Sequence, residues 1–485
     1  MVRAKWVMRR GTAIVAVAFL VATLVRETNS THFAPLDPAL IPGDIALVSV
    51  DHGAASAIAT VARTSGATDL TSLDAVDVVS ARLPHHAIET LRRDVRVRFI
   101  ASDIVIEAAG THVDDAKSSS DVKTSVGVTA IDAPQVWGTS TGRGVTVALM
   151  DTGVAAHPDL AGSVIARVDF VGDGATSLDP AGHGTFLAGV VAAHGQTLKG
   201  VAPDAKLVSL RVLDANGRGS LRNVLAAFDW LLRNRTAYNI RVLNLSFGTT
   251  QTVTYQQDVL AGVVESAWFA GIVVVVAAGN GGPTAGTVTT PGADPFVVTA
   301  GSLDDQGSAG TGDDRESTFS ARGPTLDGFA KPDVLAPGEH VLSLKASDDP
   351  MQLGYAKMTG TSVASAMVAG IAALVLQPKS SYSPTQVKGA IVGGARKVWG
   401  SRTPGAMADG SLWTVPVPVN VGLVPSGTLT RLLVSQGALA AGGASWEGIA
   451  WEGISWETLS WEAVSWECVS WESVAWERIT VEEVR

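Results

Sequence analysis

The run Ile272-Val273-Val274-Val275-Val276-Ala277 is the strongest of several short apolar segments in the middle of this sequence. A short, Val-rich run that ends at Gly279 and Asn280 is typical of a strand buried on both faces of a sheet. Four further segments have the same character: 145–150, 207–213, 242–247 and 296–300. The sequence therefore predicts a buried sheet that contains these segments as strands.

Helical segments separate the predicted strands. Ser383-Pro384-Thr385-Gln386 has the pattern of a capping box with proline at the first helical position, which predicts the start of a helix. Strands that alternate with helices predict a doubly wound α/β fold, with a mostly parallel sheet covered on both faces. Ligands bind such sheets at the carboxyl ends of the strands. The other helices are expected at 185–193, 221–233, 255–270 and 362–376.

Four polar residues stand at the ends of these elements. Asp151 and Asn280 follow predicted strands, and His183 and Ser362 begin predicted helices. A serine hydroxyl becomes a useful nucleophile when an imidazole takes its proton and a carboxylate holds that imidazole in place. A side-chain amide can donate to the oxyanion that then develops. Each residue alone has an ordinary structural explanation, Ser362 as a helix cap for example, but together the four predict nucleophilic acyl transfer.

The segment from about 125 to 440 resembles the subtilisin-like serine peptidases (subtilases, peptidase family S8). Four motifs occur in the order of that family: Asp151-Thr-Gly, His183-Gly-Thr, Ala-Ala-Gly-Asn280 and Gly-Thr-Ser362-x-Ala. The resemblance implies that Asp151, His183 and Ser362 form the catalytic triad and that Asn280 contributes to the oxyanion hole. Further segments resemble the family at 156–160, 200–203, 244–248, 319–324 and 331–338.

The resemblance also implies a peptide-binding cleft, where an extended substrate adds as a strand. Thr289 stands where the family commonly has a glycine at the base of the main specificity pocket, so we expect a preference for small or medium apolar residues before the cleaved bond. The Thr290–Pro291 peptide bond is expected to be cis. The residues expected to bind substrate are Ser246, Phe247, Gly248, Ala278, Gly279 and Thr289.

Other functions remain open at this stage. Asp151-Thr-Gly by itself also matches the signature of aspartic peptidases, but the second such motif is missing from the chain. A homodimer would supply it, yet that alternative leaves His183, Asn280 and Ser362 unexplained. A second alternative is a binding protein that uses the fold as a scaffold, and a third is a narrowly specific processing peptidase tethered by one of its ends.

Composition excludes several classes of protein. The chain has 485 residues and a formal net charge of −10, which argues against nucleic acid as a partner. Its single cysteine, Cys468, excludes an intramolecular disulfide and a cysteine-based zinc site. Cofactors are not needed for the expected chemistry, and we expect no metal.

Structural calcium is the one metal role that the sequence raises. Asp159 matches an aspartate that binds calcium in many members of the family, but Lys199 stands in the following loop where oxygen ligands are wanted. A second acidic stretch, at 304–316, is better explained as a solvated loop.

The first residues of the chain are typical of an export segment. Four cations precede an uncharged run at 11–25, which is shorter than a bilayer requires, so a cleaved signal peptide at 1–29 is favoured over a retained membrane anchor. A secreted or cell-surface protein is expected. By resemblance, 30–120 comprises a small α/β propeptide that inhibits the enzyme, with a polar maturation linker at 109–124. Its closing elements are expected to be a helix at 86–93 and a strand at 95–107.

The end of the chain repeats with a period of five. Trp446-Glu447 recurs in seven pentads, with serine before the tryptophan in five of them and alanine in two, so that 7 of the 13 tryptophans lie in this tail. A period of five matches neither a strand nor a helix. We expect a tail at 441–485 that binds a surface or a protein partner, with a small solenoid or a disordered tail as alternatives. The catalytic domain is then expected at 121–440, in a monomeric protein.

Overall fold

The computed structural model describes residues 33–115 and 126–426. The chain divides into two compact units, Met1–Ile104 and Val105–Arg485. Within the described residues, none of the helices is both long and apolar enough to cross a bilayer. The predicted signal segment at 1–29 and the pentad repeats at 441–485 lie outside the described residues.

The N-terminal unit is a small α/β sandwich. Its four strands are all antiparallel to their neighbours, in the order β2-β3-β1-β4. Apolar side chains of both helices, such as Ile58 and Leu91, are buried in one cluster with Val48 and Ile100 of the sheet. The small α/β domain expected before the catalytic segment is therefore present. Its elements are β1 (Ile45–Val50), α2 (Ala55–Thr64), β2 (Thr68–Leu73), β3 (Val78–Arg82), α3 (His85–Arg92) and β4 (Val97–Ser102).

The prediction of a single strand at 95–107 is wrong. This segment forms two strands, β4 and β5 (Val105–Ala108), which belong to different sheets and different compact units. The backbone N–H of Asp103 still bonds to Ile45 of the N-terminal sheet, whereas Val105 pairs with a strand of the larger unit. An apolar run shows extended structure but not which edge each half will join.

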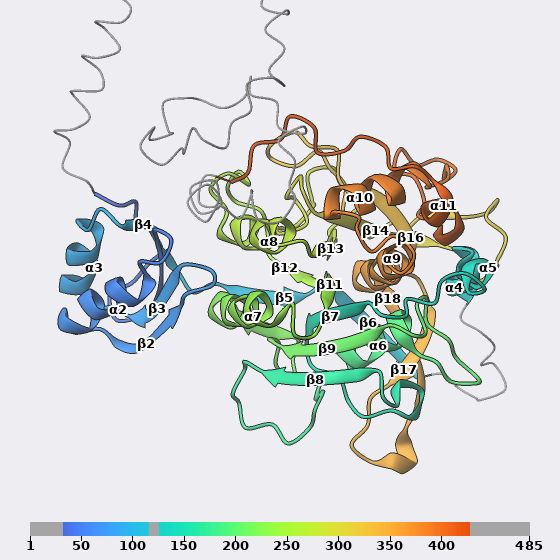
Figure 1. Cartoon of the computed structure of the whole chain (residues 1–485), viewed down its shortest axis with the longest axis horizontal. Coiled ribbons are helices and arrows are strands. Elements are labelled where there is room, and N and C mark those ends of the chain that lie inside the picture. The colour runs from blue at the N-terminus through green and yellow to red at the C-terminus, as the bar shows by residue number, and fades with distance from the viewer. Residues whose placement is uncertain (1–32, 116–125, 427–485) are drawn as a thin grey trace, which may run out of the picture. The chain divides into compact units, whose positions relative to one another are not determined.

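The larger unit is built on a mostly parallel sheet (Figure 1), with the order β15-β14-β13-β11-β7-β9-β8 and β16 beside β14. Only the short β15 is antiparallel to its neighbour. All five strands expected from the apolar runs are present in this sheet. The strands are β7 (Thr146–Asp151), β8 (Val164–Asp169), β9 (Lys206–Arg211), β11 (Ile240–Leu245), β13 (Val273–Ala277), β14 (Val298–Asp304), β15 (Arg315–Glu316) and β16 (Val334–Pro337).

Helices cover both faces of this sheet. The chain moves from β7 to the edge strand β8, returns to β9, which lies between these two, and then passes β7 to reach β11 and β13. The helix at 183–192 packs against the helix at 361–376, and the helix at 221–234 packs against the helix at 259–269 (Figure 1). The predicted helices are confirmed, although α8 begins after Asp258, whose carboxylate caps it, rather than at 255. The helices are α4 (Val126–Ala130), α5 (Ala133–Val136), α6 (His183–Ala192), α7 (Leu221–Asn234), α8 (Val259–Phe269), α9 (Thr361–Leu376), α10 (Pro384–Gly393) and α11 (Ala408–Trp413), with short 3₁₀ turns at Pro158–Leu160 and Pro350–Gln352.

Two small antiparallel sheets complete the larger unit. One has the order β10-β5-β12 and the other β17-β18-β6. Residue 109 alone separates β5 from β6, so a continuous stretch of chain joins the two sheets. The strands are β6 (Gly110–Asp115), β10 (Arg218–Ser220), β12 (Phe247–Gly248), β17 (Val341–Lys345) and β18 (Gly354–Gly360). The predicted domain boundary at 120 and the compact division at 104 differ, because residues 105–115 pair with strands of the larger unit.

Candidate active site

Asp151 and His183 meet at the carboxyl end of β7. Nδ1 of His183 is 2.7 Å from Oδ1 of Asp151, and both side chains are buried. The close approach depends on glycine: a Cβ on Gly184 would lie 2.0 Å from the carbonyl oxygen of Gly153. Burial opposes a charge on His183, but the negative charge and hydrogen bond of Asp151 outweigh it, so the pKa of His183 is raised above its ordinary value.

A third buried carboxylate, Asp179, connects the segments that carry this pair. Its Oδ1 accepts hydrogen bonds from the Thr152 hydroxyl at 2.7 Å and from the Gly182 N–H at 2.9 Å. Its Oδ2 accepts from the N–H of Thr185 at 2.7 Å and from its hydroxyl at 2.5 Å. Burial raises the pKa of Asp179, although these hydrogen bonds oppose that shift. The sequence motifs did not single out Asp179, and its position four residues before His183 was the available signal.

Ser362 lies at the start of α9, which is buried along its whole length. Its hydroxyl donates to the carbonyl oxygen of Ser246 at 3.3 Å. Nε2 of His183 is buried and has no hydrogen-bond partner among the described residues. The serine–histidine hydrogen bond is therefore not formed in this structure. Such bonds often form only when the reacting complex is assembled.

Asn280 follows β13 and is held by the residue before Ser362. Its Oδ1 accepts from the Thr361 N–H at 3.0 Å and from the Thr361 hydroxyl at 2.9 Å. This orientation directs the amide nitrogen toward a peptide carbonyl: Nδ2 donates to the oxygen of Ala109 at 2.5 Å. The Asn280 amide thus acts as a hydrogen-bond donor to a carbonyl oxygen. Thr361 is a second positioning residue that sequence analysis missed.

The residues expected to bind substrate do not all line the same surface. Ser246 is fully buried, and its hydroxyl bonds to Asn244 and Ser365, but its carbonyl accepts the Ala109 N–H at 2.8 Å. Phe247 and Gly248 form β12, which pairs with β5. Ala278 packs in a small apolar cluster with Val288, Ala293 and Ala321. Ser246 and β12 therefore contact the segment at 107–109 through their backbone.

Thr289 fills the space between two glycines. A Cβ on Gly279 would meet the Thr289 methyl group at 2.8 Å, and one on Gly248 would meet the Thr289 hydroxyl at 2.7 Å. The hydroxyl donates to the Ala278 carbonyl at 3.2 Å, which holds the side chain there. The next peptide bond, Thr290–Pro291, is cis, as predicted.

The two candidate calcium sites consist of residues with protein partners. Asp159 accepts a hydrogen bond from the Tyr355 hydroxyl at 3.0 Å. In the acidic stretch, Asp314 pairs with Arg396, and Glu316 pairs with Arg322 at 2.8 Å. Across 33–115 and 126–426, no cluster of three or more His, Cys, Asp or Glu side chains is arranged to hold a metal ion.

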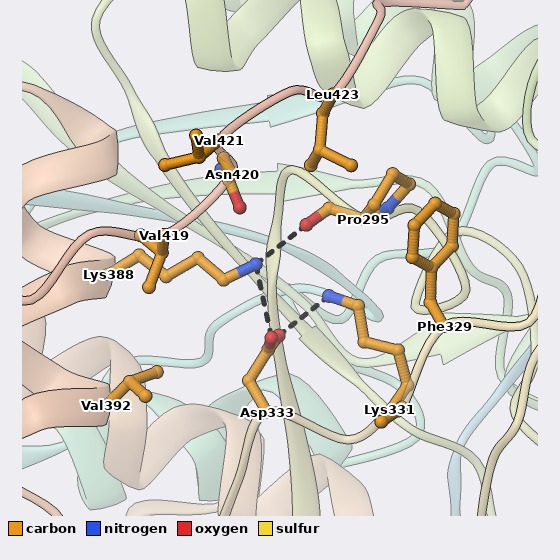
Figure 2. Close-up of a pocket in the computed structure, with 11 residues that line it drawn as sticks. Pro295, Phe329, Lys331, Asp333, Lys388, Val392, Val419, Asn420, Val421 and Leu423 are labelled. Carbon is orange, nitrogen blue, oxygen red and sulfur yellow. Dashed lines mark hydrogen bonds and ion pairs between the residues drawn. The ribbon is translucent and has the colours of Figure 1, made fainter. Parts of the chain in front are cut away.

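A pocket of about 360 Å³ lies elsewhere in the larger unit (Figure 2) and is lined by none of the predicted site residues. Asp333 lies there between Lys331, at 2.7 Å, and Lys388, at 3.1 Å. Lys388 also donates to the carbonyls of Pro295 and Val297 at 2.7 and 3.0 Å. Burial lowers the pKa of Lys388 to about 7. Because these contacts tie α10 to the loops around β14, the cluster has a structural role.

Comparisons with known proteins identify the family and agree with the fold. The model of the Subtilase family matches residues 142–410. The chain is 39% identical over 297 residues to the serine protease AprX of Bacillus subtilis, a match that covers 56% of this chain and 66% of AprX. It is 34% identical over 266 residues to subtilisin Savinase of Lederbergia lenta, covering 54% of this chain and 87% of that protein.

A solved structure shares the fold. Fervidolysin from Fervidobacterium pennivorans, described as a keratinolytic enzyme related to subtilisin, superposes with a TM-score of 0.65 at 23% identity. The match covers 81% of this chain and 64% of fervidolysin. The fold and the site define the class of serine-type peptidases, which are hydrolases. The chain belongs to the subtilase family.

Proposed function

We propose that this protein is an exported serine endopeptidase that hydrolyses peptide bonds through an acyl-enzyme on Ser362. The observation that carries the proposal is the hydrogen bond from Asn280 to a peptide carbonyl, together with the buried Asp151–His183 pair in the same compact unit. A donor already directed at a carbonyl oxygen stabilises the negative charge that nucleophilic attack places on that oxygen.

The mechanism follows from the roles of these side chains. Ser362 Oγ adds to the carbonyl carbon while Nε2 of His183 takes its proton. Asp151 holds the imidazole through Nδ1 and stabilises the imidazolium that forms. The carbon–nitrogen bond breaks as His183 returns the proton to the leaving amine. Water then attacks the ester by the same route and releases the acid product. Nothing in this sequence of steps needs a cofactor.

The protein is made as a zymogen in this proposal. The small N-terminal unit is the propeptide and inhibits the site until it is removed, and residues 1–29 direct export. The alkaline serine exoprotease A of Vibrio alginolyticus, 34% identical over 319 residues, is among the related proteins. The substrates are polypeptides, and the tryptophan repeats serve a surface or protein partner.

Thr289 restricts the residue before the cleaved bond. Its side chain occupies the space between Gly248 and Gly279, so a large aromatic residue would have to displace it. We expect small or medium apolar residues to be preferred at this position. Cleavage profiling with a peptide library checks this, and a strong preference for Phe or Tyr would contradict it.

The central test uses a fluorophosphonate probe on the purified full chain. Wild type is expected to be labelled at Ser362 and to hydrolyse peptides, whereas Ser362→Ala should do neither. Ser365→Ala is a matched control, because Ser365 lies one turn further along α9 and its hydroxyl bonds back to the Ser362 carbonyl. Absence of labelling in wild type, before and after removal of the N-terminal unit, would contradict the proposed function.

A further inference from the structure

Residues 105–109 cross the candidate active site as a strand between two strands of the same compact unit. β5 pairs antiparallel with β10, Ile106 opposite Gly219, and with β12, Ala108 opposite Phe247. The backbone N–H of Ala109 continues this ladder to Ser246. An extended segment added between two strand edges is the arrangement in which peptides are recognised through their backbone.

The contacts single out one peptide bond in this segment. On one side of that bond, the Ala109 carbonyl accepts from Asn280, and the Ser246 carbonyl accepts from both the Ala109 N–H and the Ser362 hydroxyl. On the other side, Gly110 pairs with Gly360, two residues before Ser362. Groups that flank Ser362 therefore hold the bond from both ends.

The side chains before this bond have distinct surroundings. Ile106 is fully buried. Glu107 accepts two hydrogen bonds on one oxygen from the Arg218 guanidinium, at 2.9 Å from Nε and 2.6 Å from Nη2. Ala109 has a small side chain, which agrees with the proposal that Thr289 restricts the size of the residue before the cleaved bond. An aliphatic, an acidic and two small residues thus occupy successive positions.

We propose that Ala109–Gly110 is the bond that this chain cleaves in itself. We also propose that Arg218 makes the same cleft prefer substrates with an acidic residue two positions before the residue that supplies the carbonyl of the cleaved bond. This inference rests on the proposed function. Ser362 Oγ bonds to the Ala109 carbonyl carbon and loses its proton to His183; the Ala109–Gly110 bond breaks as that proton passes to the Gly110 nitrogen. Water then releases the Ala109 carboxylate, and Gly110 becomes the new N-terminus.

The preferred substrates are therefore peptides of the pattern aliphatic-acidic-Ala-Ala. The Glu107–Arg218 pair is more than half exposed on both sides, so its effect on kcat/KM should be modest, about two- to fivefold. Reversing its charge should have a larger effect than neutralising it, because attraction is replaced by repulsion.

The first experiment determines the N-terminus of the mature protein. The full chain is purified, its products are analysed by intact mass and N-terminal sequencing, and labelling by the fluorophosphonate probe is recorded in parallel. A product that begins at Gly110, absent in Ser362→Ala, supports the inference. Ala109→Phe should slow this cleavage, whereas Ala57→Phe, the same change on an exposed face of α2, should not.

The two proposals fail in different ways. A protein that takes up the probe but matures at another bond overturns the inference and leaves the proposed function standing. A protein that neither takes up the probe nor cleaves any peptide contradicts the proposed function itself.

The second experiment tests Arg218 on peptides and does not depend on maturation variants. Mature wild type and Arg218→Glu are compared on Ile-Glu-Ala-Ala-p-nitroanilide and Ile-Lys-Ala-Ala-p-nitroanilide. Wild type should prefer the Glu peptide and Arg218→Glu the Lys peptide, while Ile-Gln-Ala-Ala-p-nitroanilide should differ little between the two enzymes. Equal preferences in both enzymes would overturn the role of Arg218.

Discussion

Two buried clusters of charged side chains in the larger unit differ in whether their polar atoms have hydrogen-bond partners. Around Asp333, both carboxylate oxygens and both lysine ammonium groups have partners (Figure 2). In the Asp151–His183 pair, Oδ2 of Asp151 and Nε2 of His183 are buried without a partner among the described residues. A buried polar group without a partner costs stability, so the fold retains at its candidate site a cost that it avoids at the lysine cluster.

The difference separates structure from chemistry. A completely satisfied cluster has no group left for a substrate, and it ties α10, β14 and the neighbouring loops together. A cluster with a free imidazole nitrogen has a group that can take a proton. Changes in the first cluster should therefore affect stability, and changes in the second should affect activity.

The largest expected effect is on activity. His183→Ala should lower kcat by about 10⁴-fold or more, because the nucleophile loses its base. Its unfolding free energy should change less than that of the Asp333 variant below. Steady-state kinetics and urea unfolding measure the two quantities, and a variant that keeps a tenth of wild-type kcat would remove His183 from the mechanism.

Asp333→Asn should show the reverse pattern. It leaves the buried ammonium group of Lys331 without its hydrogen-bonded counter-charge, which costs about 3–5 kcal/mol of unfolding free energy. Activity per folded molecule should stay near wild type. Asp348→Asn, at an exposed carboxylate, is the matched control and should change stability by less than about 0.5 kcal/mol. Equal stabilities of the two variants would show that the cluster is not structural.

Asp179→Asn should affect both activity and stability, each by less than in the two variants above. The carboxylate accepts four hydrogen bonds, and an amide nitrogen cannot accept the pair on one side. Displacement of Thr152 and of the start of α6 should lower kcat by up to about 10²-fold, with KM nearly unchanged. A change in KM alone would place Asp179 in substrate binding instead.

The pH profile should reflect the raised pKa of His183. The base must be neutral to accept a proton, and its raised pKa keeps it charged to a higher pH than an ordinary imidazole. The acidic limb of kcat/KM should therefore lie above the ordinary value of 6.5. A limb at or below 6.5 would show that the influence of Asp151 does not exceed that of burial.

Lys388 predicts a smaller effect, on the pH dependence of stability. Its pKa is lowered from 10.5 in the unfolded chain to about 7 in the fold, so the unfolded state holds the extra proton between these values. The unfolding free energy of wild type relative to Lys388→Met should rise as pH increases from about 7 toward 10. A pH-independent difference between the two proteins would contradict the lowered pKa.

Much of the fold could be predicted because its signals are local. The apolar runs at 145–150 and 272–277 became β7 and β13, and Ser383 caps α10 with the predicted capping box. β8 was missed because its residues alternate between half-buried and exposed, so it lacks the continuous apolar run. Most strands of the two small sheets were missed because their pairing depends on distant partners.

The sequence by itself determined the residue types at the strand ends, and with them the family and the candidate residues Asp151, His183, Asn280 and Ser362. Tertiary structure decided what those residues contact. Asp179 and Thr361 acquired positioning roles because long-range packing brought them to Thr152 and Asn280, and residues 105–109 joined the cleft because two strand edges there lacked a partner. Local patterns specify elements, but hydrogen-bond partners far apart in sequence are set only when those elements pack.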